Sequence, residues 1–131
     1  MLDIIHLDDH RLFREGFLKS VIRQYFPNTN LYEFDNGDNA EHFILNRLQT
    51  GKKLDLIISD INHSGVQGDY SVPSREWERN LLKGLKTPTL IFSMRERQAT
   101  QKFLQNCGYS YLHKSCEPRI IVEVIEDLLY L

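Results

Sequence analysis

An apolar run that ends in a carboxylate, Leu54-Asp55-Leu56-Ile57-Ile58-Ser59-Asp60, lies near the middle of the 131-residue chain. Such uninterrupted Leu and Ile residues are typical of a central strand in a parallel sheet, which helices cover on both faces. Open α/β sheets bind their ligands at the carboxyl ends of these strands. We therefore expect Asp60 to lie at a ligand-binding edge, where a buried carboxylate needs a partner. Taken alone, Asp60 fits equally well an aspartate that caps a loop or a helix.

The composition narrows the class of protein before any motif is considered. A chain of this length fits one domain, residues 1–131, with a single core. The formal net charge of -2 gives no basic surface, so we expect this domain not to bind nucleic acid by itself. Cys107 and Cys116 match neither a zinc site nor a disulfide framework. Because no apolar run could span a membrane and Asp3 argues against a signal peptide, we expect a cytoplasmic protein.

The rest of the sequence alternates between strand and helix patterns. Besides the central run, strands are expected at residues 2–7, 31–34, 88–92 and 109–113. Helices are expected at residues 10–26, 39–48, 74–85, 95–106 and from 118 onward. Asp38 is the expected N-cap of the second helix, Gly51 its terminator, and Pro118 the first residue of the last helix.

Apolar residues at helical spacing predict the faces that pack on the sheet. In the first helix they are Leu12, Phe13, Phe17, Val21 and Tyr25. Gly16, which interrupts this helix, suggests close packing. In the second helix they are Phe43, Ile44 and Leu48, and in the last helix Ile121, Val124, Ile125, Leu128 and Leu129. We expect His6, His10, His42 and His113 to be packing or surface residues.

The alternation of strands and helices predicts a fold. Right-handed crossovers give a doubly wound α/β fold with a five-stranded parallel sheet. The natural choice is the flavodoxin-like strand order 2-1-3-4-5 in a three-layer α/β/α arrangement, which puts the first and third strands side by side. The pair Asp8-Asp9 and Asp60 then converge at one edge, flanked by Ser93 and Lys114 from the next strand ends.

Three neighbouring carboxylates repel one another unless a cation lies among them. Ligation by oxygen atoms favours a hard ion, above all Mg²⁺. The Ser93 hydroxyl and the Lys114 ammonium suit a ligand with several anionic oxygens, such as a phosphoryl group. Asp60 could attack its phosphorus while the cation offsets the developing charge.

This ordered set of residues resembles the receiver domains of two-component response regulators, over essentially the whole chain. The resemblance rests on Asp8-Asp9, Asp60, Ser93 and Lys114, each at the end of its expected strand. It implies that a sensor histidine kinase or a phosphotransfer protein phosphorylates Asp60. Ser93 and Lys114 would then be the catalytic residues that bind the phosphoryl oxygens.

The resemblance also implies roles for further residues. Asp9 would bind Mg²⁺ directly, Asp8 partly through water, and Asn62 through its backbone carbonyl. Ser93 would be the switch hydroxyl and Tyr111 the switch aromatic, acting on a partner or output surface. A homodimer is possible.

The stretch Asp8-Asp9-His10-Arg11-Leu12-Phe13-Arg14-Glu15-Gly16 is similar to receivers of the LuxR/NarL type, which usually precede a DNA-binding domain. Regulation of transcription through a further domain is therefore one expectation, and a free-standing receiver is the other. The chain departs from the family with His63-Ser64-Gly65 in place of Met-Pro-Gly, with Met94 after Ser93, and with Ser115 where proline is frequent.

Two other classes of protein fit part of the pattern. A phosphatase of the haloacid-dehalogenase type also forms an aspartyl-phosphate, but it expects an acid where this chain has Asn62. A pseudo-receiver would bind partners without being phosphorylated, and it would not need the complete set of acids, hydroxyl and lysine.

Overall fold

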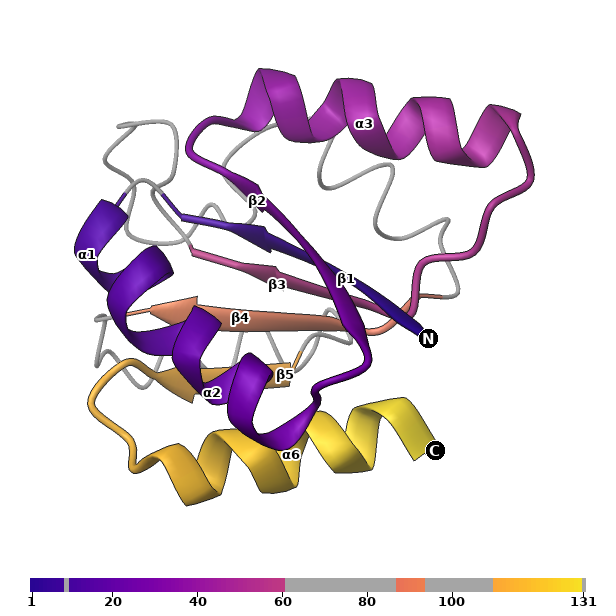
Figure 1. Cartoon of the computed structure of the whole chain (residues 1–131). Coiled ribbons are helices and arrows are strands. Elements are labelled where there is room, and N and C mark those ends of the chain that lie inside the picture. The colour runs from indigo at the N-terminus through magenta and orange to yellow at the C-terminus, as the bar shows by residue number, and fades with distance from the viewer. Residues whose placement is uncertain (9, 61–86, 94–109, 131) are drawn as a thin grey trace.

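The computed structural model describes residues 1–8, 10–60, 87–93 and 110–130. In this part of the chain five parallel strands form one sheet in the order β2-β1-β3-β4-β5, as the sequence predicted (Figure 1). The strands are β1 (Leu2–Leu7), β2 (Thr29–Phe34), β3 (Leu56–Ser59), β4 (Thr89–Ser93) and β5 (Ser110–His113). The central strand β3 is buried at every position, which fits its unbroken apolar sequence.

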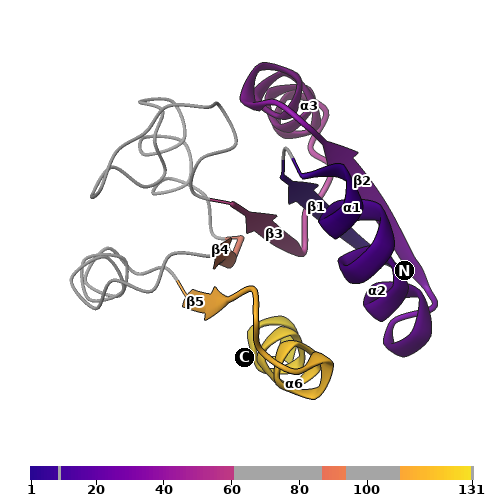
Figure 2. The same cartoon turned by 90° about the vertical axis from the view of Figure 1, so that its left-hand side faces the viewer.

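Helices lie on both faces of this sheet. They are α1 (Arg11–Phe13), the π-helical segment η1 (Arg14–Leu18), α2 (Lys19–Tyr25), α3 (Gly37–Gln49) and α6 (Pro118–Tyr130). Figure 2 shows α3 on one face, and α1, α2 and α6 on the other. The helices predicted at 74–85 and 95–106 lie outside the described residues. Among the helices described, none combines the length and the apolar character needed to cross a membrane.

The buried side chains form two clusters, one on each face of the sheet. The first joins η1, α2 and α6 to the sheet through Leu18, Val21, Ile22, Ile121, Val122 and Ile125, which pack on Ile4, Leu56, Ile58, Leu90 and Phe92. The second joins α3 to the other face through Ile44, which packs with Ile5, Leu54, Ile57 and Ile91. Odd and even positions of each strand thus serve opposite cores, as the pleat requires.

The first helix differs from its prediction because it contains the π-helical turn η1. A π turn uses i→i+5 hydrogen bonds, so it adds a residue and shifts the phase of the apolar stripe. Leu12, which precedes the shift, is 88% exposed, and Tyr25 at the other end is 49% exposed; both were expected to face inward. Leu18 and Ile22 are buried in their place. No neighbour packs closely against Gly16, contrary to the prediction, since a Cβ atom there would meet nothing within 4 Å.

Helix α3 begins and ends with specific hydrogen bonds. Its N-cap is Asn36, not Asp38, because the Asn36 side chain accepts a hydrogen bond from the backbone N–H of Asn39 at 2.9 Å. At the other end Gly51 has a φ of +68° and donates to the Leu48 carbonyl, as in a Schellman motif. The predicted terminator is therefore confirmed. Ile44 faces inward as expected, whereas Leu48 is 43% exposed.

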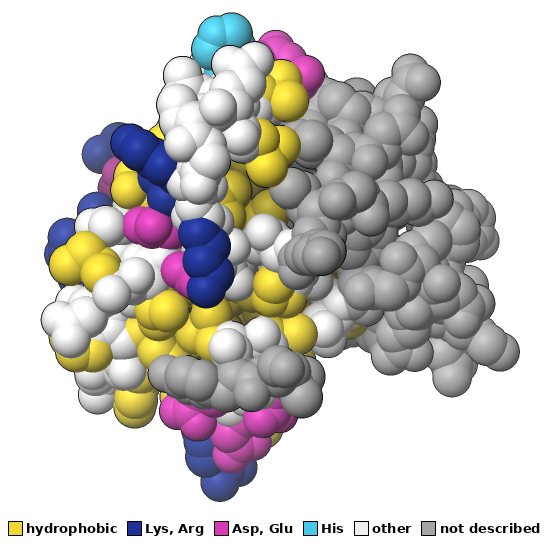
Figure 3. Space-filling view, turned by 90° about the vertical axis from the view of Figure 1, so that its right-hand side faces the viewer, with side chains coloured by type: hydrophobic (Ala, Val, Ile, Leu, Met, Phe, Trp, Pro, Cys, Tyr) yellow, Lys and Arg dark blue, Asp and Glu magenta, His cyan; other side chains and the backbone are white. Residues whose placement is uncertain are grey.

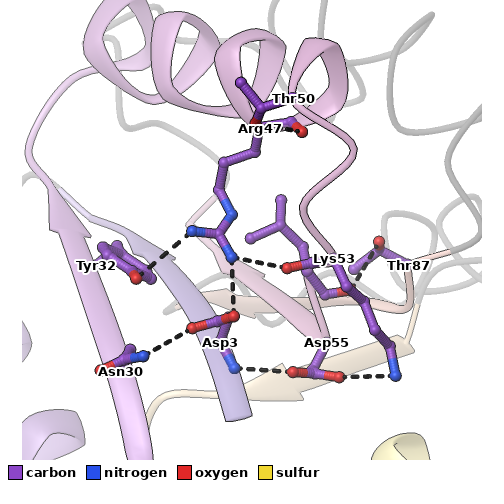
Figure 4. Close-up of polar contacts among 9 residues, drawn as sticks. Asp3, Asn30, Tyr32, Arg47, Thr50, Lys53, Asp55 and Thr87 are labelled. Carbon is purple, nitrogen blue, oxygen red and sulfur yellow. Dashed lines mark hydrogen bonds and ion pairs between the residues drawn. The ribbon is translucent and has the colours of Figure 1, made fainter. Parts of the chain in front are cut away.

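A polar network ties α3 to the amino ends of the strands (Figure 4). Arg47 forms an ion pair with Asp3 at 2.8 Å and donates to the Lys53 carbonyl at 2.8 Å. Its guanidinium carbon also lies 5.3 Å from the centroid of the Tyr32 ring. Asp55 accepts a hydrogen bond from the backbone N–H of Asp3 at 2.8 Å. This network therefore holds β1, α3 and the start of β3 together.

The face at this amino end carries a mixture of acidic, basic and hydrophobic side chains over its described part (Figure 3). It includes a cavity of about 380 Å³ lined by Leu48, Lys52, Lys53, Leu54, Asp55, Thr87, Pro88, Leu128 and Leu129. Asp8, Asp60 and Lys114, which were predicted to act together, do not line it. They lie at the opposite, carboxyl end of the strands.

Candidate functional site

The register of the sheet brings Asp8 and Asp60 side by side. Leu7 pairs with Ser59 in the last rung between β1 and β3, so an aspartate follows each strand at the same level. The backbone N–H of Asp60 donates to the Leu7 carbonyl at 2.9 Å, and that of Asp8 donates to the Phe34 carbonyl at 3.0 Å. Both acids are therefore anchored at the carboxyl edge through their own backbone.

Lys114 reaches these acids from the end of β5, two strands away from β3. Its Nζ lies 2.7 Å from Asp8 Oδ2 and donates a hydrogen bond to Asp60 Oδ2 at 3.1 Å. Its side chain is only 3% exposed, and both carboxylates are buried as well. The structure thus places one ammonium between two buried carboxylates. Asp9, the third acid in the prediction, lies outside the described residues.

The balance of charges around Asp8 is unfavourable for its ionised form. Burial raises the pKa of the Asp8 carboxyl, and the charge of Asp60 raises that pKa further. The hydrogen bonds from Lys114 and from the His10 backbone N–H, the latter 2.8 Å from Asp8 Oδ1, oppose this effect without cancelling it. A further cation at this edge would therefore be stabilised.

His6, which was predicted to have only a packing or surface role, lies beside this site. It is buried in β1, and its Nε2 lies 3.9 Å from Asp8 Oδ2. Burial, followed by the charges of Lys114 and Arg14, lowers the pKa of His6 to about 3, so its imidazole is neutral at pH 7. The sequence could have predicted this neighbour, since His6 precedes Asp8 by two residues and residues two apart on a strand point to the same face.

Arg14 is a second residue at the site that was not predicted from the sequence. Its Nη1 donates to the backbone carbonyl of Asp8 at 2.6 Å, and its backbone N–H donates to the His10 carbonyl at 2.9 Å. These bonds connect the first turn of the helical segment to the loop that carries the acids. Arg14 is the first residue of the π turn η1, which apolar periodicity does not reveal.

Asp8, His10 and Asp60 offer one ligand atom each, and these atoms all lie within 4.8 Å of one another. Asp8 Oδ2 is buried, and the charged group beside it is the Lys114 ammonium, with Nζ at 2.7 Å. Two carboxylates that repel each other and retain acceptor capacity are a suitable donor set for a divalent cation. The oxygen atoms fit Mg²⁺, while the exposed imidazole of His10 adds a nitrogen donor of the kind that transition metals prefer. Asn62, the other predicted ligand, lies outside the described residues.

The two predicted switch residues occupy the neighbouring strands. Ser93 ends β4 and pairs with His113 of β5; its side chain is outside the described part. Tyr111 is half-buried in β5 and packs against the cluster on the α3 face of the sheet. The backbone therefore carries both residues to the carboxyl half of the sheet, and their roles stay predictions.

No protein-family model matches this chain, and no curated protein matches it by sequence. Solved structures do match it over nearly its whole length. The BeF3-activated N-terminal receiver domain of RstA from Klebsiella pneumoniae has a TM-score of 0.77 at 16% identity, over 98% of this chain and 99% of that one. The signal receiver domain of a DNA-binding response regulator (merR) from Colwellia psychrerythraea 34H gives 0.73 at 15% identity, with both chains fully covered.

The signal receiver domain of NarL from Mycobacterium tuberculosis has a TM-score of 0.68 at 25% identity, over 96% of this chain and 94% of that one. These likenesses show that the chain has the flavodoxin-like fold of receiver domains. An acidic cluster of Asp8, His10 and Asp60 lies at the carboxyl edge of that fold.

Proposed function

We propose that this chain is the phosphoacceptor domain of a two-component response regulator. In this proposal Asp60 accepts a phosphoryl group from a sensor histidine kinase or a phosphotransfer protein. The observation that carries it is the position of Lys114, whose ammonium lies between Asp60 and Asp8 at the carboxyl edge of a receiver-like sheet. A lysine buried against two acids is costly to desolvate, so a purely structural role explains it poorly.

The chemistry follows from the groups present. A carboxylate oxygen of Asp60 attacks the phosphorus of a phosphohistidine; the O–P bond forms as the N–P bond breaks, and the imidazole nitrogen keeps the electron pair. The Lys114 ammonium, already within hydrogen-bond distance of Asp60, can then hold one phosphoryl oxygen. We assign the Ser93 hydroxyl to another of these oxygens.

We expect this transfer to depend on Mg²⁺. Asp8 and Asp60 would hold the ion together with Asp9 and the backbone carbonyl of Asn62. When bound, Mg²⁺ offsets the negative charge that develops on the phosphoryl oxygens. The raised pKa of Asp8 supports this assignment, because it reflects a burial cost and a repulsion from Asp60 that a cation would relieve.

Phosphorylation would act on a partner through the switch residues. We propose that Ser93 and Tyr111 change position when Asp60 is modified, and that this alters the surface around β5 and its neighbouring helices. In a cytoplasmic regulator of transcription, a separate DNA-binding domain or a homodimer would read this change.

Mass spectrometry after incubation with acetyl phosphate and Mg²⁺ tests the proposal. We expect the intact chain to gain one phosphoryl group, which hydroxylamine removes because an acyl phosphate is the product. Asp60→Asn should abolish the gain, whereas Asp127→Asn, an exposed carboxylate of α6, should leave it unchanged.

Three results would contradict the assignment in different ways. Labelling that persists in Asp60→Asn would mean that another residue is the acceptor. Absence of both labelling and Mg²⁺ binding in the wild type would favour a pseudo-receiver. Turnover of a generic phosphate ester without accumulation of label would favour a phosphatase.

A further inference from the structure

Lys114 is held in place although it lies beyond the sheet ladder. The last rung between β4 and β5 joins Ser93 to His113, so Lys114 is the first residue after it. A lysine side chain has four rotatable bonds, and extending it toward two carboxylates restricts all of them. The orientation of the backbone at residue 114 therefore decides whether the ammonium reaches the site.

A short turn of hydrogen bonds encloses this backbone. Nδ1 of His113 accepts a hydrogen bond from the backbone N–H of Ser115 at 3.1 Å, and Ser115 Oγ lies 2.6 Å from the same nitrogen. Because Nδ1 accepts from the N–H, it carries the lone pair, and the Ser115 hydroxyl donates to it as well. The carbonyl of His113 also accepts a hydrogen bond from Cys116 N at 3.1 Å.

These bonds span Lys114 on both sides. The ring of His113 binds the residue that follows the lysine, and the His113 carbonyl closes the turn one residue later. Ser115 itself is exposed and faces no core, so its hydroxyl contributes little to the packing of the domain. What the pair fixes is the direction in which the chain leaves β5.

We propose that His113 and Ser115 are positioning residues for Lys114, and that their hydrogen bonds keep its ammonium between Asp8 and Asp60. Within the part of the chain that the structure describes, these hydrogen bonds of the two residues stay in the turn around Lys114 and do not involve the Asp60 carboxylate. Their effect on phosphoryl transfer rests on the function proposed above, but their effect on the position of Lys114 does not.

The first experiment measures the position of Lys114 directly, through its reactivity toward an amine-acylating reagent followed by peptide mass spectrometry. In the wild type we expect Lys114, with a side chain that is 3% exposed, to react far more slowly than Lys53, which is 84% exposed. Ser115→Ala should accelerate acylation of Lys114 about fivefold, as the loss of one hydrogen bond predicts, with Lys53 unchanged. Ser20→Ala, which removes an exposed hydroxyl of α2, is the matched control.

Conservative variants separate positioning from a general loosening of the fold. Ser115→Thr retains the N–H and the hydroxyl, and His113→Asn retains an acceptor near the place of Nδ1. We expect both to keep Lys114 protected, whereas His113→Ala should expose it. If Ser115→Ala and His113→Ala leave the acylation rate of Lys114 at the wild-type value, the proposal is wrong.

The second experiment uses the same variants with acetyl phosphate. Ser115→Ala should slow phosphorylation while the Kd for Mg²⁺ does not rise, because the metal ligands are not altered. A wild type that takes up no phosphate would refute the proposed function alone, since the acylation experiment still tests the positioning. If Ser115→Ala instead weakened Mg²⁺ binding as much as it slowed phosphorylation, Ser115 would not act specifically on the position of Lys114.

Discussion

At the scale of single residues, the site combines groups with opposite effects on stability. Lys114 neutralises part of the charge of Asp8 and Asp60, yet the pKa of Asp8 stays raised because burial and the neighbouring Asp60 outweigh its partners. As the pH falls from the raised folded pKa of Asp8 toward its unfolded value, protonation of this carboxyl stabilises the folded state. A buried carboxylate that is suited to bind a cation thus reduces the stability of the ligand-free protein.

His6 should have the opposite effect on acid stability. Its pKa is lowered from 6.5 to about 3 in the folded protein, so between these values the unfolded chain binds a proton that the folded chain does not. Stability from this residue is therefore present at neutral pH and is lost as the pH falls. We expect a loss on the order of 2 kcal/mol between pH 7 and pH 5.

Urea unfolding at pH 7 and pH 5 measures this loss. His6→Leu should lose less stability than the wild type over that interval, while His42→Gln, a change at an exposed histidine of α3, should behave like the wild type. An identical pH dependence in His6→Leu and wild type would show that His6 does not titrate as proposed.

His10 should affect which metal ion the site prefers. Its imidazole shares the cluster with Asp8 and Asp60, and nitrogen ligands favour transition metals over Mg²⁺. In titration calorimetry, His10→Ala should therefore bind Mn²⁺ several-fold more weakly than the wild type, with a smaller change for Mg²⁺. His42→Ala provides the control. Equal losses for both ions would indicate that His10 acts through the loop and not as a ligand.

At the scale of secondary-structure elements, two glycines have opposite roles although both were assigned to helices or their ends. Gly16 lies within η1 without a positive φ, and a Cβ atom would have open space there. Gly51 has a φ of +68° just after α3, a conformation that disfavours residues with a Cβ atom.

We expect Gly16→Ala to stabilise the domain by about 0.5–1 kcal/mol. Gly51→Ala should destabilise it by about 1 kcal/mol. Thermal unfolding of the two variants and the wild type measures both changes in stability. A destabilising Gly16→Ala would mean that the π turn requires glycine.

At the scale of the whole molecule, the two ends of the sheet carry different groups, one set for chemistry and the other for stability. The carboxyl end carries the buried acids and Lys114, whereas the amino end carries the network of Arg47, Asp3 and Asp55. The register of β1 with β3 fixes the relative positions of both ends. Changes at the amino end should therefore reduce stability without changing the chemistry.

Arg47→Met tests this separation. It leaves the half-buried Asp3 carboxylate without its charged partner, so we expect a loss of about 2 kcal/mol in the free energy of unfolding. Phosphorylation of the folded variant by acetyl phosphate should match that of the wild type. Arg23→Met, at an exposed position of α2, should change neither quantity. Slower phosphorylation in folded Arg47→Met would show that the two ends are coupled.

Much of the fold could be predicted from the sequence because it depends on repeating local patterns. Alternating strands and helices gave the order β2-β1-β3-β4-β5, and the unbroken run before Asp60 gave its central strand. Parallel strands end at one edge, so the meeting of Asp8, Asp60 and Lys114 followed from their positions alone.

Tertiary structure alone decided the features that break a local pattern or depend on contacts between distant segments. The π turn, the exposure of Leu12 and the hydrogen bond from Arg14 to the Asp8 carbonyl are invisible to a count of apolar spacings. The neutral state of His6 depends on burial and on charges from Lys114 and Arg14, which other segments supply. Sequence patterns record which face a residue prefers, whereas electrostatics and hydrogen-bond geometry depend on distances that exist only once the chain has folded.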